Sequence, residues 1–295
     1  MDIIDLDLAR LADVLGSQLG GSVDAISATA LGASSRETPW RIDFSLNGLE
    51  KSVLLRYGKG CSRNEANILC AMEHVAIPTP RILIWDEAGD ELGTPLFVSE
   101  FICGESLLPA MKAGESWAHD LYIQTATELQ AIQASDLPDG AVDSLEEGES
   151  ANEVLADAHA MMGDNDPLIE QAYRRLVDTK PALPHTQFSN GDLWPDNLLV
   201  RDRKLVGVID WQHAGFSDPL FEFLLPFFLV PELRGLGIEE RFCRHKGIDA
   251  KVLHWYHGLE FFDSLRWVLK TGKPYEMHTA ESLRGDLETW LDATV

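Results

Sequence analysis

Apolar residues in the first fifth of the chain recur first at helical and then at strand intervals. Five leucines within residues 5–19 stand at near-helical spacing, and Gly20 and Gly21 follow them, a pattern that predicts an amphipathic helix with a glycine stop. Apolar-rich runs at 40–44 and 51–56 come next and are typical of strands. We therefore expect one helix and then two or three strands at the start of the chain.

One more helix and two more strands are predicted after these. Ser62, followed three residues later by Glu65, has the form of a capping box and opens an apolar-periodic segment. The proline-rich stretch 77–80 ends that helix. Apolar runs at 81–85 and 95–102 then indicate strands, which complete the strand-rich part of the chain.

The remainder of the chain has a mainly helical pattern that one hairpin interrupts. Helices are expected at residues 117–134, 151–162, 167–177, 220–230, 248–270 and 279–291. The stretch 135–150, rich in Pro, Gly and acidic residues, is expected to be a surface loop. Two apolar runs, 198–200 and 205–209, flank the polar turn 201–204 and predict a β-hairpin.

Oxygen-bearing side chains gather at one end of this hairpin. Antiparallel pairing brings Asn197, before the first run, beside Asp210, after the second, and Asp192 lies on the preceding loop. Such oxygens suit Mg²⁺, whose coordination shell phosphate oxygens and water complete. In kinase-type phosphoryl transfer, one Asp accepts the proton of the attacking hydroxyl while an Asn and a second Asp hold the metal. The same residue types also build ordinary turns.

Residues 190–211 resemble the catalytic loop and metal-binding segment of the aminoglycoside phosphotransferase and choline kinase family. Asn190-Gly191-Asp192, Asn197 and Ile209-Asp210-Trp211 match the family pattern, except that Asn190 stands where His is usual. Asn offers donors and an acceptor, but it is shorter than His and does not titrate near neutral pH. We therefore expect the loop to be held differently in this chain, with activity retained.

The resemblance extends from about residue 33 to residue 222 and implies a fold of the α+β class. This is the two-lobed protein-kinase-like fold, with a small antiparallel-sheet N-lobe in residues 1–102 and a larger, mainly helical C-lobe in residues 103–295. A hinge between the lobes is expected near residues 99–104. A chain of 295 residues is long enough for such a two-lobed unit.

The resemblance also implies a nucleotide site in the N-lobe. The small-residue loop that contains Ala33, Ser34 and Ser35 matches a family loop whose backbone N–H groups approach phosphates, although a plain hairpin turn has a similar composition. In the family, backbone groups of the hinge hold the adenine. These groups correspond here to the C=O of Ser99 and the N–H of Phe101.

A cation and an acidic partner complete the implied nucleotide site. Arg56 ends a predicted strand at the position where kinases place a Lys for the phosphates, and its charged fork can clamp phosphate. Glu65 on the next helix matches the acidic residue that pairs with this cation. The alternatives are that Arg56 is an exposed residue closing an edge strand, with Lys59 as its substitute, and that Glu65 only caps its helix.

The implied activity is that of an ATP- and Mg²⁺-dependent small-molecule kinase. Asp192 acts as the catalytic base, and Asn197 and Asp210 hold Mg²⁺, while the γ-phosphoryl group passes to a hydroxyl of a metabolite or antibiotic. An aminoglycoside, a choline-like amine, a sugar, a macrolide or a hydroxyacyl thioester is compatible as acceptor. The choice between ATP and GTP and the oligomeric state stay open.

The net charge of the chain limits the classes of binding partner that are expected. The formal net charge of −24 argues against nucleic acid, which requires an excess of Lys and Arg. It suits a cationic substrate by electrostatic steering, although acidic surfaces also serve solubility alone. Acidic, basic and aromatic residues within 248–270 form a candidate acceptor pocket, since the family places its acceptor against C-terminal helices: His254, His257, Glu260, Asp263 and Arg266.

Two alternatives to a small-molecule kinase are considered. One is a catalytically inactive pseudokinase that binds a nucleotide or metabolite; the presence of Asp192, Asn197 and Asp210 together argues against it. The other is a protein kinase, but the chain has no Ala-Pro-Glu segment after Asp210 and no room for a long activation loop before Asp218. Asp218 itself matches a family residue that braces the catalytic loop, or it is a helix N-cap.

The remaining composition indicates a soluble, cytoplasmic protein. No apolar run is long enough to span a bilayer, and the first residues lack the basic region of a signal peptide. The four cysteines show no C-x-x-C pair, so reduced thiols are expected.

Overall fold

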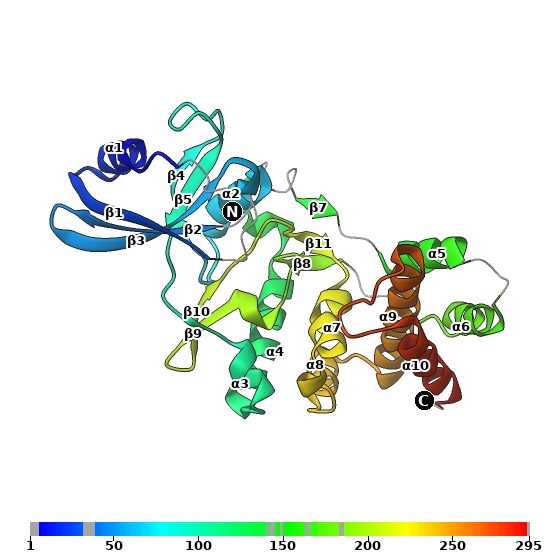
Figure 1. Ribbon diagram of the computed structural model, residues 1–295. Coiled ribbons are helices and arrows are strands. Elements are labelled where there is room, and N and C mark those ends of the chain that lie inside the picture. Colours follow the sequence, from blue (N-terminus) through cyan, green and yellow to red (C-terminus); the bar gives the residue numbers. More distant parts are fainter. Residues whose placement is uncertain are drawn as a thin grey trace. The chain divides into compact units, whose positions relative to one another are not determined.

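The computed structural model describes residues 6–31, 39–139, 141, 145–147, 150–162, 166–182 and 186–293 (Figure 1). The chain forms two compact units: unit 1 comprises residues 1–107, 133–146 and 196–214, and unit 2 comprises residues 108–132, 147–195 and 215–295. Asp192 therefore belongs to unit 2, whereas Asn197 and Asp210 belong to unit 1. The lobe boundary after residue 102 stays a prediction.

Unit 1 is built on a five-stranded antiparallel sheet (Figure 1). Its strands in spatial order are β1 (Val23–Ala30), β2 (Trp40–Leu46), β3 (Leu49–Tyr57), β5 (Leu96–Glu100) and β4 (Ile82–Asp86). Asn47 and Gly48 connect β2 to β3 with φ angles of 52° and 79°. Two positive φ angles define the tight turn whose twist matches that of paired strands, so the local sequence fixes this hairpin.

Two helices belong to the same unit. The apolar face of α1 (Leu8–Leu19), which ends at Gly20 in the left-handed region, packs into the core of the sheet. Its buried partners in that core include Leu11, Leu15, Ile42, Phe44, Val53 and Leu55. The second helix, α2 (Arg63–Met72), begins at Ser62, whose Oγ accepts a hydrogen bond from the N–H of Glu65 at 3.2 Å. The predicted N-cap is therefore present.

A second sheet of unit 1 contains the predicted catalytic hairpin. Strands β9 (Leu198–Arg201) and β10 (Lys204–Val208) pair antiparallel, and β6 (Glu105–Ser106) pairs with the other edge of β9. The turn consists of Asp202 and Arg203, both with positive φ. The polar turn that separates the two apolar runs thus has the backbone of a tight hairpin.

Unit 2 is mainly helical. Its helices are α3 (Leu108–Lys112), α4 (Ser116–Ala131), α5 (Ala151–Met162), α6 (Pro167–Asp178), α7 (Pro219–Leu229), α8 (Ile238–Lys246), α9 (Ala250–Thr271) and α10 (Ala280–Asp292). Strands β8 (Gln187–Ser189) and β11 (Gly215–Ser217) pair antiparallel. Short elements elsewhere are β7 (Glu146–Glu147) and the 3₁₀ helices η1 (Gly58–Gly60), η2 (Ala134–Asp136), η4 (Pro195–Asn197) and η5 (Pro231–Leu233).

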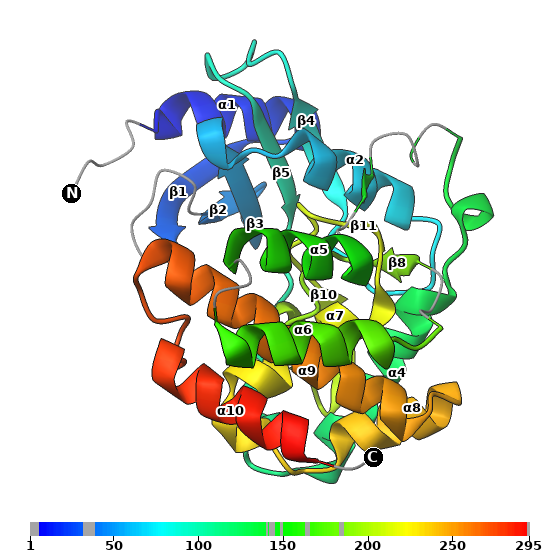
Figure 2. The same cartoon turned by 90° about the vertical axis from the view of Figure 1, so that its right-hand side faces the viewer.

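The long helix α9 is central to the packing of unit 2. It contacts α5, α6, α8 and α10 (Figure 2). Gly258 on α9 lies against Trp290 of α10, and a Cβ at this position would lie 2.2 Å from the indole ring. Since protein interiors are close-packed, only glycine permits this approach, and the Trp290 Nε1–H then donates to the backbone oxygen of His254 at 2.8 Å.

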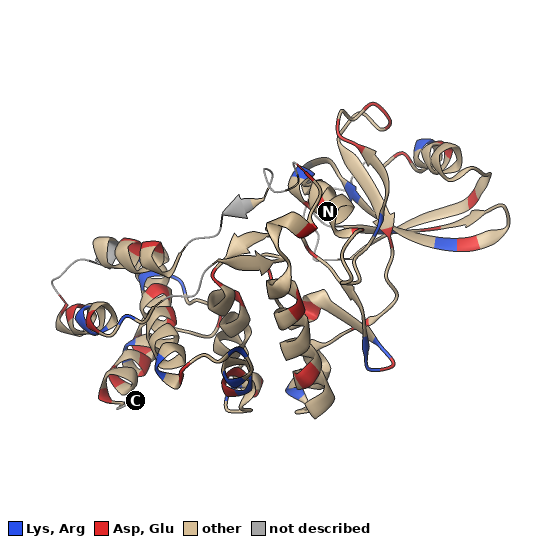
Figure 3. Ribbon diagram, turned by 180° about the vertical axis from the view of Figure 1, so that it is seen from behind, with Lys and Arg blue, Asp and Glu red and all other residues tan. Residues whose placement is uncertain are grey.

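These elements confirm the predicted fold class, a small antiparallel sheet with a mostly helical remainder. Asp and Glu residues outnumber Lys and Arg by 48 to 24, and Figure 3 marks acidic residues in red along helices and loops of both units. Among the described residues, no helix combines the length and the apolar character needed to cross a membrane.

Candidate active site

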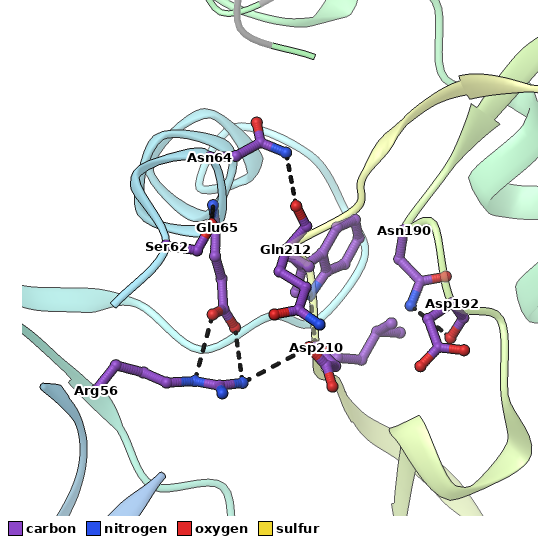
Figure 4. A network of polar contacts seen from close by, with 10 residues as sticks. Arg56, Ser62, Asn64, Glu65, Asn190, Asp192, Asp210 and Gln212 are labelled. Carbon is purple, nitrogen blue, oxygen red and sulfur yellow. Dashed lines mark hydrogen bonds and ion pairs between the residues drawn. The ribbon is translucent and has the colours of Figure 1, made fainter. Parts of the chain in front are cut away.

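Three charged side chains meet in unit 1 (Figure 4). Arg56, near the end of β3, places Nε 3.3 Å from Oε2 of Glu65 and Nη2 3.3 Å from Oε1 of the same carboxylate. The same Nη2 lies 3.6 Å from Oδ1 of Asp210. The side chains of Arg56 and Glu65 are only 12% and 4% exposed. Arg56 is therefore not the exposed residue of an edge strand. The carboxylate of Glu65 pairs with Arg56, while the hydroxyl of Ser62 caps α2.

The ion pair compensates a buried charge. Burial raises the pKa of Glu65, the Arg56 guanidinium opposes that rise, and Asp210 adds to it. A buried ion pair contributes little net stability, but removal of one partner leaves a costly unpaired charge. Arg56 and Glu65 thus hold each other in a defined orientation, with one guanidinium nitrogen directed toward Asp210 (Figure 4).

The backbone around Asp210 presents its carboxylate at the end of the hairpin. The N–H of Ile209 donates to the carbonyl oxygen of Asn197 at 2.9 Å, so the residues that follow and precede the paired strands are neighbours. Asp210 has a φ of 60°, a left-handed conformation that Asp tolerates better than most residues. Next to it, the Trp211 Nε1–H donates to the carbonyl oxygen of Val208 at 2.8 Å, which anchors the segment.

The donor set at this end of the hairpin fits Mg²⁺. Asp210 offers a carboxylate whose Oδ1 receives no hydrogen bond from any described residue, and Asn197 offers an amide oxygen. Within the described part of the chain, no group of three or more His, Cys, Asp and Glu side chains is arranged to hold a metal ion. Two protein oxygens agree with the habit of Mg²⁺, which relies on phosphate oxygens and water for the rest of its shell.

The predicted nucleotide residues of unit 1 line one cavity of about 320 Å³. Arg56, Glu65, Ser99, Phe101 and Asp210 all belong to its wall. The rest of the wall is mainly apolar and includes Leu31, Leu54, Leu69, Pro80, Ile102, Leu199 and Ile209. An apolar cavity with charged groups on its wall is suited to a planar base that carries a charged tail.

Some predicted residues of this region cannot be placed. Ala33, Ser34 and Ser35 lie outside the described residues, and so does the side chain of Lys59. The assignment of the loop to phosphate binding therefore stays a prediction.

The loop of unit 2 that contains Asp192, the predicted base, is fixed on one side by a carboxylate that the sequence did not reveal. The Gly191 N–H donates to Ser189 Oγ at 3.2 Å, and the Ser189 hydroxyl donates to Glu222 on α7. The other oxygen of Glu222 accepts a hydrogen bond of 2.6 Å from the hydroxyl of Ser217 on β11. Gly191 itself has a φ of 79°, which favours glycine.

The same loop is fixed on its other side by Tyr122. The hydroxyl of this fully buried residue of α4 donates to the carbonyl oxygen of Leu193 at 2.9 Å. Burial raises the pKa of Tyr122 well above its usual value, so the hydroxyl remains a neutral donor. The backbone oxygen of Asp192 accepts from Asn190 Nδ2 at 3.0 Å and from the Trp194 N–H at 2.6 Å. The backbone on both sides of Asp192 is therefore held in place.

Asp218 has a different role from Glu222. Its side chain accepts from the N–H of Leu220 at 2.9 Å and thereby caps α7, and its Oδ2 accepts from the Tyr256 hydroxyl at 2.5 Å. Of these two acids, Glu222 is the one that hydrogen-bonds to Ser189, next to the catalytic loop. The one clue in the sequence is that Glu222 is the sole charged residue of the otherwise apolar helix α7.

Only some residues of the candidate acceptor pocket line one cavity, and its assignment to the acceptor stays a prediction. His257 and Glu260 line a cavity of about 300 Å³ in unit 2, with an aromatic wall that includes Phe227, Phe228, Tyr256 and Phe261. The other members of the predicted group lie differently. Asp263 pairs with Arg266 at 2.6 Å and lines a second cavity, whose wall also includes Glu260. His254 stacks on Trp290.

Acidic groups dominate the polar part of this acceptor cavity. Burial, with a smaller contribution from Asp263, raises the pKa of Glu260 to about 8. Glu239, also on the wall, is paired with His257 at 2.8 Å. The cavity therefore combines apolar surface with carboxyl groups, a lining that suits an acceptor with a basic group.

Comparison with known proteins supports the kinase-like interpretation of this geometry. Residues 61–256, more than half of the chain, match the model of the phosphotransferase enzyme family. The chain belongs to this family. A stretch of 233 aligned residues is 25% identical to acyl-CoA dehydrogenase family member 10 of Mus musculus and covers 67% of this chain and 21% of that protein.

A second relative is the aminoglycoside 3′-phosphotransferase of Niallia circulans. It is 25% identical over 146 residues, which represent 48% of this chain and 55% of that protein. The chain thus spans about half of one relative and about a fifth of the other.

A solved structure covers nearly the whole chain. It is a thermostable mutant of aminoglycoside phosphotransferase APH(4)-Ia in complex with ADP and hygromycin B. The two chains superpose with a TM-score of 0.61 over 97% of this chain and 100% of the other, at 18% sequence identity. This similarity confirms the predicted protein-kinase-like fold.

Proposed function

We propose that this member of the phosphotransferase enzyme family transfers the γ-phosphoryl group of ATP to a hydroxyl of a small molecule. The observation that carries the proposal is the meeting of Arg56, Glu65 and Asp210 on the wall of one largely apolar cavity. The ADP bound by the structural relative supports a nucleotide in this cavity.

Unit 1 binds and orients the nucleotide in this proposal. The base occupies the apolar part of the cavity, against the backbone of Ser99 and Phe101. Arg56 contacts the phosphates, and Glu65 fixes the direction of its guanidinium fork, which matches phosphate geometry better than a Lys would. Positioning of this kind supplies a large part of the barrier reduction in phosphoryl transfer.

Asn197 and Asp210 hold Mg²⁺ together with phosphate oxygens. When bound, the ion neutralises charge on the transferred phosphoryl group. The left-handed backbone at Asp210 and the hydrogen bond between Ile209 and Asn197 keep both side chains at the end of the hairpin.

Asp192 accepts the proton of the attacking hydroxyl. Its backbone is held by Asn190, Trp194 and the contacts of the neighbouring residues, so its carboxylate needs little reorganisation when the acceptor arrives. A general base positioned in this way contributes about 10²- to 10⁴-fold in rate.

The acceptor binds in unit 2, in the cavity lined by His257 and Glu260. Its carboxyl groups suit an acceptor that carries an amino group, and the name of the Niallia circulans relative and the hygromycin B of the structural relative point to aminoglycosides as the first compounds to test. Sugars, choline-like amines, macrolides and hydroxyacyl thioesters belong in the same panel.

The test is Mg²⁺-dependent ADP formation by the purified protein with this panel. Asp192→Ala is expected to abolish acceptor-dependent turnover while ATP still binds, and Asp157→Ala, on the exposed side of α5, serves as the control. Equal turnover by wild type and Asp192→Ala would refute the assignment of the base. Mg·ATP binding without turnover of any acceptor by either protein would instead indicate a nucleotide-binding protein without kinase activity.

A further inference from the structure

The hydroxyl of Ser99 is buried on the wall of the nucleotide cavity without a hydrogen-bond partner. Ser99 has no solvent exposure, and none of the described residues forms a hydrogen bond with its Oγ. The residue is nevertheless part of the wall of the 320 Å³ cavity of unit 1. A polar atom that is hidden from water, lacks a protein partner and faces a cavity calls for a ligand group.

The strand itself has no need of this hydroxyl. Ser99 lies in β5, where it pairs with Leu54 of β3 and Ile82 of β4, and the preceding residues Phe97 and Val98 are apolar and fully buried. A β-branched apolar residue would suit such a central strand better than Ser. Buried polar side chains are almost always hydrogen-bonded, and an unsatisfied one lowers stability. The unsatisfied hydroxyl therefore lowers the stability of the folded protein when no ligand is bound.

The surroundings limit what the ligand group can be. The cavity wall near this strand is apolar, with Leu54, Pro80 and Ile102 among its members, and an apolar wall with one hydroxyl fits a flat ring that carries a polar substituent. Among the charged members of the wall, Arg56 fits the phosphates of the same ligand, and Asp210 would meet them through Mg²⁺. A nucleotide base meets both requirements.

We propose that the Ser99 hydroxyl hydrogen-bonds to the exocyclic group at C6 of the purine base. This inference rests on the proposed function, since it uses the same nucleotide cavity. The 6-amino group of adenine has two N–H donors; one can bind a backbone carbonyl of the hinge segment, and the other is then available to Ser99 Oγ. Ser99 thus adds a side-chain contact to base recognition, which backbone contacts alone do not provide.

The test compares two nucleotides on two proteins. ATP and purine riboside 5′-triphosphate, which lacks the 6-amino group, are titrated by calorimetry in the presence of Mg²⁺ into wild type and Ser99→Ala. For ATP the variant is expected to bind about 3- to 10-fold more weakly, the range of one neutral hydrogen bond. For the analogue the two proteins are expected to agree within about twofold, because no partner for the hydroxyl remains.

A stability measurement provides an independent arm. Without nucleotide, Ser99→Ala should unfold at the same temperature as wild type or higher, because it removes an unsatisfied buried group. Ser99→Cys, which keeps the side-chain shape with a weaker acceptor, should lie between wild type and Ser99→Ala in ATP affinity. A general packing defect would instead lower both the unfolding temperature and the affinity for both nucleotides.

The outcomes separate this inference from the proposed function. Equal weakening of both nucleotides by Ser99→Ala, or no weakening of ATP, would overturn the role of Ser99 and leave the kinase proposal intact. If wild type binds no nucleoside triphosphate, the kinase proposal itself fails. Selective weakening of ATP supports both.

Discussion

The proposed nucleotide cavity of unit 1 and the loop around Asp192 in unit 2 organise their polar side chains in different ways. In unit 1, Arg56, Glu65 and Asp210 are linked by charge at separations of 3.3 to 3.6 Å. In unit 2, hydroxyl groups donate directional hydrogen bonds, such as the 2.9 Å bond from Tyr122 to the backbone oxygen of Leu193. The charged groups of unit 1 can still bind a ligand. The loop of unit 2 is already fixed by hydrogen bonds within the protein.

In the proposed function, this difference follows from what each region has to bind. Phosphates and a metal ion bring their own charge, so Asp210 gains its full set of partners only with ligand. The loop around Asp192 has to offer one carboxylate in one direction, and directional hydrogen bonds fix a backbone better than Coulomb attraction does. We therefore expect substitutions in unit 1 to change nucleotide and Mg²⁺ dependence, and substitutions around the loop to change kcat.

The largest expected effect is that of Asp210→Asn. It removes the charge of the proposed metal ligand, and kcat should fall about 100-fold or more, because metal-mediated charge stabilisation is worth several kcal/mol. The Mg²⁺ concentration for half-maximal activity should also rise. Steady-state rates over a Mg²⁺ series measure both effects.

The hairpin contains a matched control for this substitution. Asp202 is exposed at the turn and also has a positive φ, 51° against 60° for Asp210. Asp202→Asn should leave the rate and the Mg²⁺ dependence unchanged. If the two variants behave alike, Asp210 is not a metal ligand.

A smaller effect is expected for Glu222→Gln. Glu222 accepts hydrogen bonds from both Ser189 and Ser217, and an amide offers only one oxygen in place of two. The catalytic loop should loosen, with a fall of about 10-fold in kcat and less than a twofold change in the KM for ATP, as for an interaction that positions the base.

A double-mutant cycle checks that Glu222 acts through Ser189. Ser189→Ala should lower kcat similarly, and the double variant should be no worse than either single one, because coupled residues are not additive. Glu128→Gln on α4 is the control for loss of a charge. A rise in the KM for ATP with unchanged kcat would contradict the proposed positioning role. It would also contradict the expectation that substitutions around this loop change kcat rather than nucleotide dependence.

The sequence predicts the features that are formed by residues close together along the chain. The hairpin was predicted because its two apolar runs flank a polar turn, and Asp202 and Arg203 adopt that turn. The proximity of Asn197 and Asp210 follows from the same pairing. The meeting of Arg56 and Glu65, only 9 residues apart, was anticipated through the family resemblance.

The sequence does not predict the contacts that hold the loop around Asp192. Ser189 and Glu222 are 33 residues apart, and Tyr122 and Leu193 are 71 apart. No turn, period or cap links such positions, because the contacts depend on how α4 and α7 pack in unit 2. Asp218 was considered as a brace for the loop, yet its carboxylate caps α7 and binds Tyr256, since it begins that helix.

The smallest expected effect concerns Glu260, an acidic group on the wall of the unit 2 cavity. The other titratable or charged groups on the wall of the same cavity are Arg234, Glu239, Glu240, Tyr256, His257 and Asp286. Burial raises the pKa of Glu260 to about 8, and Asp263 adds to the rise. A raised pKa means that the folded protein binds the proton more tightly than the unfolded chain does.

The sign of the pH dependence follows from that pKa. The contribution of Glu260 to stability is fully present below its ordinary pKa of 4.5 and is lost as the pH rises through about 8. Glu260→Gln cannot ionise, so its unfolding temperature should match that of wild type near pH 4 and exceed it at pH 9, by about 2–4 °C for each kcal/mol of difference. Glu288→Gln on α10 should show no such pH-dependent difference in unfolding temperature from wild type. A wild-type unfolding temperature that falls toward pH 9 in parallel with that of Glu260→Gln would show that Glu260 stays ionised in the folded protein, as a carboxylate exposed to water would.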